Sequence, residues 1–197
     1  MGGGDDDLEA AFAAHDKRRV LTLLMTRHGD GIYRYAMAMT RDSHLADEIR
    51  QQVFVDAYRD LDKVTGADAL PAWTFGIARN RCLDAVRARV QWAERYKNEP
   101  PEHAEPVDHD LDHDLGHDLD RGRLARILAD CLAKLAPAVR DAVVLRYQQE
   151  LSYDEAAAIA GDLPGTLQRR VARALPVLRR CVQAALRRNS CHELRSC

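Results

Sequence analysis

Apolar residues recur at helical spacing through most of the chain. Ile49, Val53, Ala57 and Leu61 follow one another at intervals of four residues, which predicts one buried helix face. Patterns of this kind predict helices at about 8–28, 30–40, 44–61 and 70–96, then at about 121–135, 137–149, 152–160, 164–175 and a last one ending near 188. Because β-branched residues are few and no hairpin signal separates alternating apolar runs, we expect an all-α fold.

The stretch from Asn98 to Asp120 has a different composition. It holds nine acidic residues, three of the seven prolines and four of the eight histidines, but no Lys or Arg. Such a segment buries too little apolar surface to offset its ordering entropy. We therefore expect a flexible acidic linker at 98–120 between two small helical domains, at 8–97 and 121–188, with a disordered N-terminus at 1–7 and a Cys-containing tail at 189–197.

The acidic stretch also hides the charge of the two domains. The whole chain carries 29 Lys and Arg against 31 Asp and Glu, a formal net charge of −2. Without the nine acids of the linker, the balance is 29 against 22, or +7. Residues 165–197 alone hold eight arginines and one glutamate. The near-neutral total therefore does not exclude a nucleic-acid partner, and the basic end of the chain favours one.

Several other classes of protein do not fit the sequence. No stretch longer than residues 69–78 lacks a charged residue, so we expect no membrane-spanning helix. Residues 1–7 do not have a basic region followed by an apolar one, so we expect no secretory signal. Five scattered cysteines fit a reducing cytoplasm better than a disulfide framework. We also expect no enzymatic activity, because the sequence has no phosphate-binding glycine loop, His-Glu-x-x-His motif or nucleophile–base pair.

Residues 152–173 have the spacing of a helix-turn-helix. Ser152 and Glu155 form the signature of a capping box before a short helix. Gly161 and Asp162 can turn the chain, and Pro164 suits the first turn of a second helix. The alternative is a small helical bundle with a solvated arginine face.

The second helix of this motif places donors where DNA would be read. Gln168, Arg169 and Arg173 follow its start and can reach base edges or phosphates. Before the linker, a second basic helix is predicted from residue 72 to residue 97. One stripe of it begins apolar and becomes polar, through Trp73, Ile77, Asn80, Asp84 and Arg87. Asn80 could bond to the bases of an opened strand, whereas the alternative is a local hydrogen bond between Asn80 and Asp84.

The order of the motifs resembles the extracytoplasmic-function (ECF) group of bacterial sigma-70 factors. Ala46-Asp-Glu-Ile-Arg-Gln-Gln-Val-Phe54, and Ile77-Ala-Arg-Asn80 with Asp84, resemble the second sigma domain of that family. Leu151-Ser-Tyr-Asp-Glu-Ala156 and Gly165-Thr166 resemble its fourth. The resemblance covers both expected domains and their separation by a linker.

This resemblance implies a promoter-specificity subunit that binds core RNA polymerase and promoter DNA. It implies that the helix-turn-helix reads the −35 element and that the second sigma domain captures the opened −10 element. The residues implied are Asp47, Glu48 and Gln51 for polymerase docking; Arg79, Asn80, Asp84 and Arg87 for −10 DNA; and Gln168, Arg169, Arg170 and Arg173 for −35 DNA.

Four positions depart from the family pattern in the helix-turn-helix. Gln168 and Arg169 stand where Lys and Ser are usual. Asp162 stands where an apolar turn residue is usual. Pro176 lies where the recognition helix normally continues, and we expect it to end or kink that helix near residues 172–175.

The mode of regulation stays open at this point. The resemblance implies a cytoplasmic protein without membrane insertion, and it leaves an anti-sigma factor open as a further partner. We expect no cofactor. The alternative is a metal- or redox-responsive regulator whose sensor lies in the tail, where Cys181, Cys191, His192 and Cys197 offer a tetrahedral ligand set. The linker histidines His109, His113 and His117 are interpreted as solvated.

Overall fold

Every regular element in the described part of the chain is helical. The computed structural model describes residues 3–95 and 119–193. The elements are α1 (Gly3–Ala13), α2 (Lys17–Thr40), α3 (Ser43–Asp60), the 3-10 turns η1 (Leu61–Lys63) and η2 (Ala67–Ala69), α4 (Leu70–Arg95), α5 (Leu119–Ala133), α6 (Pro137–Tyr147), α7 (Tyr153–Ala160) and α8 (Pro164–Glu193). The predicted all-α class is confirmed. Most of the expected linker and the end of the tail lie outside the described residues. Among the described helices, none is long and apolar enough to cross a membrane.

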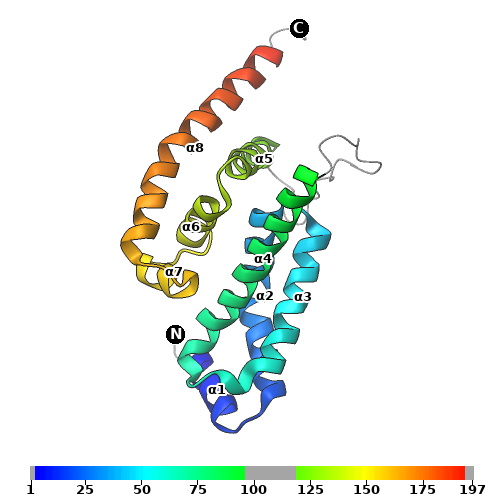
Figure 1. Ribbon diagram of the computed structural model, residues 1–197, viewed down its shortest axis with the longest axis vertical. Coiled ribbons are helices and arrows are strands. Elements are labelled where there is room, and N and C mark those ends of the chain that lie inside the picture. Colours follow the sequence, from blue (N-terminus) through cyan, green and yellow to red (C-terminus); the bar gives the residue numbers. More distant parts are fainter. Residues whose placement is uncertain (1–2, 96–118, 194–197) are drawn as a thin grey trace.

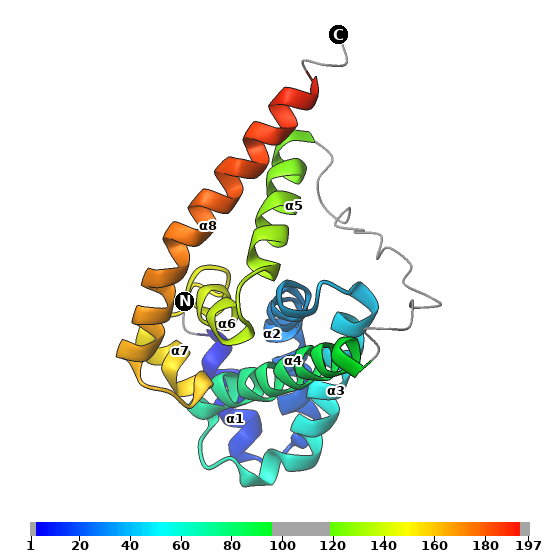
Figure 2. The ribbon, with the colours of Figure 1, turned by 45° about the horizontal axis from the view of Figure 1, so that its top comes forward.

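The helices form two bundles that lie against each other. Helices α1–α4 make the N-terminal bundle and α5–α8 make the C-terminal bundle (Figure 1). In the second view, α8 runs along the outer side of the C-terminal bundle beside α5 (Figure 2). The two-domain organisation is as expected from the sequence, and the domains share one buried apolar core.

The first helices begin and end at other residues than predicted. The helix expected at 8–28 is interrupted at residues 14–16, and α1 begins at Gly3, within the segment expected to be disordered. Asp16 starts a new helix because its carboxylate accepts a hydrogen bond from the Arg19 N–H at 3.0 Å. His15 lies in the turn between α1 and α2, with a φ of 54° in the left-handed region. α2 then continues without a break across the boundary predicted near residue 29.

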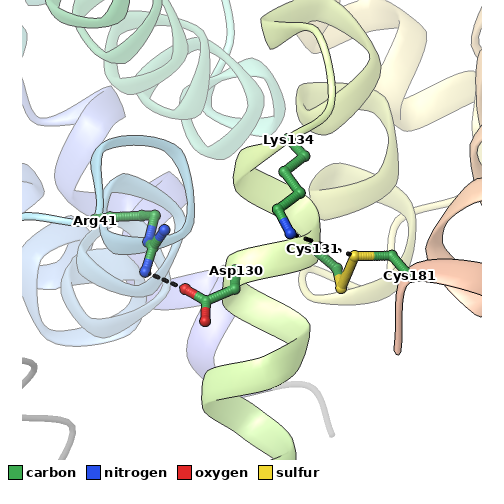
Figure 3. Close-up of a disulfide and its surroundings, with 5 residues drawn as sticks. All are labelled: Arg41, Asp130, Cys131, Lys134 and Cys181. Atoms are coloured by element: carbon green, nitrogen blue, oxygen red, sulfur yellow. Dashed lines mark hydrogen bonds and ion pairs between the residues drawn. A yellow bond between two sulfur atoms is a disulfide. The ribbon is translucent and has the colours of Figure 1, made fainter. Parts of the chain in front are cut away.

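A disulfide joins two helices of the C-terminal bundle. Cys131 of α5 is bonded to Cys181 of α8, with 5.8 Å between their Cα atoms (Figure 3). The interpretation that the cysteines fit a reducing compartment better than a disulfide framework did not foresee this pair. Their separation of 50 residues follows no local pattern, and their proximity results from the packing of α5 on α8.

The contact between the bundles is organised around a buried carboxylate. Asp141 of α6 is 1% exposed. Its Oδ1 accepts a hydrogen bond from the Tyr35 hydroxyl of α2 at 2.7 Å, and its Oδ2 accepts one from Nε of Arg79 of α4 at 2.7 Å. Burial, and then the charge of Asp141, raise the pKa of Tyr35 well above its ordinary value. The hydroxyl therefore stays protonated and remains a donor.

Arg140 extends this polar contact beside Asp141. It is 8% exposed, and its Nη1 donates to the Met39 carbonyl of α2 at 2.7 Å. Its other nitrogens donate to carbonyls at the end of α5, including that of Ala133 at 2.6 Å. Desolvation by burial lowers the pKa of Arg140 from its ordinary value. The buried guanidinium thus ties α5 and α6 to α2 through carbonyls at the ends of α2 and α5.

We expect Asp141→Ala to lower the free energy of unfolding by about 3–5 kcal/mol, because it leaves the nearly buried guanidinium of Arg79 without its counter-ion. Chemical denaturation of the full chain measures this. Asp154→Ala, which removes an exposed carboxylate from α7, is the matched control and should cost less than about 1 kcal/mol. Equal losses for the two variants would contradict the role given to Asp141.

Candidate nucleic-acid interface

The helix-turn-helix is built by local hydrogen bonds at its first helix. The Ser152 hydroxyl accepts from the Glu155 N–H at 3.2 Å, and Oε2 of Glu155 accepts from the Ser152 N–H at 2.8 Å. This confirms the capping box at the start of α7. The bonds with Ser152 also hold the pKa of Glu155 below its ordinary value. α7 ends at Gly161, whose φ of 61° is left-handed and suits glycine.

Asp162 in the turn has a structural role. Its carboxylate accepts from the Leu163 N–H at 2.9 Å and pairs with Nη1 of Arg170 at 2.6 Å. The Leu163 N–H first, and Arg170 after it, lower the pKa of Asp162. The acid that stands in place of an apolar turn residue therefore ties the turn to the first turns of α8.

The start of α8 presents three of the four predicted −35 residues to solvent. Gln168, Arg169 and Arg173 are exposed. Leu167 and Val171, on the inner face of the same turns, are buried. The fourth, Arg170, is only half exposed because it pairs with Asp162. The structure thus separates Arg170 from the other three.

α8 does not end where the sequence predicted. It runs from Pro164 to Glu193 with Pro176 inside it, so the helix does not end near residues 172–175, and a kink at Pro176 stays a prediction. Proline removes one donor to the carbonyl four residues earlier, that of Ala172. Ala172 and Pro176 are both exposed, so water can satisfy this carbonyl while the packing of the inner face carries the helix onward.

The polar stripe of α4 borders a groove in the N-terminal bundle. The groove lies between α3 and α4 and has a volume of about 690 Å³. Four of the five residues of the predicted stripe, Trp73, Ile77, Asn80 and Asp84, line it. Asn80 and Asp84 are exposed, and Asp84 forms an ion pair with Arg87 at 3.0 Å.

Arg79 lies on another side of α4. Successive residues of a helix are about 100° apart, so Arg79 points away from the groove that Asn80 borders. Its guanidinium is bound to Asp141 of the other bundle. The structure therefore brings together three of the four predicted −10 residues and places Arg79 in the contact between the bundles.

The predicted docking residues lie near the start of α3. Glu48 and Gln51 are exposed and Asp47 is partly exposed. Asp47 accepts from Nε2 of Gln51 at 3.2 Å and pairs with Arg50 at 2.6 Å. These contacts fix the carboxylate on the helix surface.

Two exposed apolar residues continue this surface, and the sequence interpretation missed them. Val55 and Tyr58 are 57% and 44% exposed. They follow Gln51 by four and seven residues, which places them on the same face of α3. Exposed large apolar side chains beside polar docking candidates are a signal of a protein contact.

Comparison with known proteins identifies the two bundles. Residues 24–91 match the family model of sigma-70 region 2, and residues 125–175 match that of sigma-70 region 4. The chain belongs to the ECF group of the sigma-70 family. It is an RNA polymerase sigma factor that directs promoter-specific transcription initiation. Region 2 is the N-terminal bundle and region 4 is the C-terminal bundle.

Individual relatives are moderately similar over most of the chain. The ECF sigma factor SigM of Bacillus subtilis is 27% identical over 128 residues, which cover 65% of this chain and 74% of SigM. SigE of Mycolicibacterium smegmatis is 30% identical over 163 residues, which cover 79% of this chain and 59% of SigE. The solved structure of CnrH in complex with the cytosolic domain of CnrY matches with a TM-score of 0.67 and 26% identity. That match covers 91% of this chain and 98% of CnrH.

Of the four candidate ligands in the tail, only the side chain of Cys181 lies in the described part of the chain. Cys181 is bonded to Cys131, so it has no thiolate to offer a metal ion. Cys197 and the side chains of Cys191 and His192 lie outside the described residues. In the part of the chain that the structure describes, no three His, Cys, Asp or Glu side chains are close enough to hold a metal ion.

We expect Pro176→Ala to stabilise region 4, by up to about 3 kcal/mol, because alanine restores the missing hydrogen bond to the Ala172 carbonyl and favours the helix. Thermal unfolding of the full chain measures the change. Pro164→Ala, at the first position of α8 where proline is tolerated, is the control and should not stabilise. A fall in stability with Pro176→Ala would mean that the proline is required by the path of the helix.

Proposed function

We propose that this sigma factor reads −35 DNA with the start of α8 and holds the opened −10 strand at the groove between α3 and α4. The observation that carries the proposal is the exposure of both candidate sets on two separate bundles. Gln168, Arg169 and Arg173 offer donors on a helix of a capped helix-turn-helix. Asn80 and Asp84 border an open groove. The protein acts by binding rather than by chemistry, in the cytoplasm where RNA polymerase works.

The groove suits an unpaired base better than duplex DNA. Trp73 and Ile77 supply apolar wall, and the Asn80 amide supplies a donor and an acceptor beside it. Extruding a base costs a few kcal/mol, whereas a stacking contact returns about 1–3 kcal/mol per base. The balance is close to zero for the sigma factor alone, so the polymerase must supply further contacts.

The polymerase contact is assigned to the outer face of α3. Gln51 gives a polar part, and Val55 and Tyr58 add an apolar part on the same face, while Glu48 lies at its border with the groove between α3 and α4. A protein interface commonly combines an apolar centre with a polar rim. This surface lies on region 2, so docking leaves the start of α8 free for DNA.

The two regions separate when the promoter is bound. Elements named −35 and −10 are about 25 base pairs apart, or roughly 85 Å of duplex at 3.4 Å per base pair. In the structure the two regions lie against each other, and we call this the closed arrangement. The Asp141 contact fixes region 4 against region 2 in it and occupies Arg79. The 23 residues at 96–118 could span up to roughly 80 Å if extended. Opening therefore suits the chain length and releases Arg79 for DNA.

An inhibitory protein could hold the closed arrangement. A groove of about 1340 Å³ lies between the two regions. Its region 4 side is mostly apolar, with Leu128, Leu132 and Val182, and its region 2 side combines charged residues such as Asp30 and Arg34 with apolar ones such as Met37. The similar protein CnrH was solved with the cytosolic domain of CnrY. We assign the groove to an amphipathic helix of an anti-sigma factor.

Run-off transcription with core RNA polymerase tests the function directly. Promoters are first found by sequencing the transcripts induced when the chain is overproduced. The chain should then direct initiation at these promoters in purified form, and core polymerase alone should not. Transcription that does not depend on the chain would contradict the proposal.

We expect Asn80→Ala to reduce open-complex formation by roughly tenfold, because one base contact of about 1–3 kcal/mol is lost. Permanganate footprinting of the opened promoter measures this, and the affinity for core polymerase should stay within about twofold. Gln91→Ala, which truncates an exposed amide further along α4, is the matched control. Loss of polymerase binding by Asn80→Ala would overturn the role assigned to Asn80.

We expect Arg169→Ala and Arg173→Ala each to weaken binding of the holoenzyme to −35 DNA. If the side chain reads a base, its loss should lower the affinity by roughly tenfold and relax the sequence preference at that base. A side chain that binds only phosphate would instead lower the salt slope by about one without changing preference. Arg188→Ala, exposed near the other end of α8, serves as the control. No effect of either substitution would overturn the assignment of α8.

A further inference from the structure

Helix α8 continues well beyond the part of the chain that matches region 4. The match to the family model ends at residue 175, whereas α8 runs on to Glu193. From residue 163 to residue 192 the chain holds seven arginines and no Asp or Glu. A surface that serves only solubility commonly mixes both signs of charge. A single sign along a helix is instead typical of a surface that binds nucleic acid.

Four of these arginines lie in one line along α8. They are Arg169, Arg173, Arg180 and Arg187, and all four are exposed. Arg187 follows Arg169 by eighteen residues, which make five helical turns, so the two side chains leave the helix in the same direction. Arg173 and Arg180 deviate from that direction by about 40° or less. We call these four residues the arginine stripe.

The arginine stripe faces away from the rest of the molecule. The inner face of α8 is formed by its buried residues, which are Leu167, Val171, Ala174 and Leu178. In both views α8 lies at the outer side of the C-terminal bundle (Figures 1 and 2). Within the described part of the chain, Arg170 pairs with Asp162, but no carboxylate pairs with an arginine of the stripe. The stripe is thus a positive surface about 27 Å long.

We infer that Arg180 and Arg187, in the second half of α8, bind the phosphate backbone of the duplex DNA that flanks the −35 bases. This inference rests on the proposed reading of −35 DNA by the start of α8. A recognition helix contacts base edges in the major groove with its first turns. Because the groove winds around the duplex, the later turns of a long helix leave the base edges and meet the backbone. Arg180 and Arg187 lie on those later turns.

Arginine is well suited to this contact. Its guanidinium stays charged and offers several donors in a planar fork that matches a phosphate group. Contacts to phosphate fix the position and orientation of a protein on the duplex without reading its sequence. The second half of α8 is also held to α5 by the bond between Cys181 and Cys131. A backbone contact at Arg187 therefore fixes the direction of α8 while its first turns read the bases.

Two neighbouring arginines lie outside the stripe. Arg179 borders the groove between the two regions. Arg188 is exposed, but it is turned by about 100° around the helix axis from Arg187. Arg188 therefore provides a matched control, because it has the same charge at nearly the same height along α8 and points in another direction.

The salt dependence of holoenzyme binding to a promoter fragment tests the contact. Each phosphate contact adds about 0.9 to the slope of log K against log salt concentration. Arg180→Gln and Arg187→Gln should each lower the slope by about 0.9, and the double variant by about 1.8. The loss of affinity should be largest at low salt. Arg188→Gln should leave the slope unchanged. Glutamine keeps the helix propensity of these positions, and circular dichroism of the full chain checks the helix content.

Two further measurements separate a backbone contact from base reading. The double variant Arg180→Lys with Arg187→Lys keeps both charges and should retain most of the slope. Changing the −35 base pairs one at a time should lower the affinity of the double glutamine variant by the same factors as that of the unchanged chain. Hydroxyl-radical footprinting should show lost protection of the sugars beside the −35 bases in the double glutamine variant only.

Three results would overturn the inference. One is an unchanged salt slope in the double glutamine variant. Another is an altered base preference, which would make these arginines base readers. The third is weaker binding to core polymerase with unchanged binding to DNA, which would assign the stripe to an acidic protein surface.

Failure of the proposed −35 function has a different signature. It would appear as no effect of Arg169→Ala and Arg173→Ala on binding of the holoenzyme to DNA. If Arg180→Gln and Arg187→Gln still lowered the salt slope in that case, the backbone contact would stand and the reading of −35 bases by α8 would fall.

Discussion

The arrangement of the two regions depends on the burial of one carboxylate. A buried charge is costly unless it is paired and hydrogen-bonded, and Asp141 finds its donors only on α2 and α4 of the other region. Arg140, beside it on α6, has the complementary need and meets it with the Met39 carbonyl of α2. Two adjacent residues of opposite charge thus fix region 4 in one position against region 2, because sliding either helix would leave a buried ion unpaired.

Local signals in the sequence predicted the local parts of this fold. The capping box of Ser152 and Glu155, with the left-handed Gly161 after it, fixes a helix by contacts within a few residues, and such contacts can be inferred from spacing alone. The end expected at Pro176 does not occur, because buried residues on the inner face, such as Ala174 and Leu178, hold α8 together across the proline.

The residues of the candidate site were likewise predictable only where a local pattern positions them. Asn80 and Asp84 share a groove because helical periodicity places them on one face of α4, and periodicity is visible in the sequence. The partner of Arg79 is not, because Asp141 lies 62 residues away in another bundle. The same limit applies to the Cys131–Cys181 pair. Pairings of this kind arise from tertiary packing, and no composition or spacing rule for a single chain indicates them.

The groove between the regions depends on two links of different chemistry. Its position is set by the Asp141 and Arg140 contacts, which are polar and break when the regions separate. The shape of its apolar wall is set by the covalent link between α5 and α8, which persists when the regions separate and yields only to a reductant. Contact with polymerase and promoter can therefore abolish the groove without changing region 4.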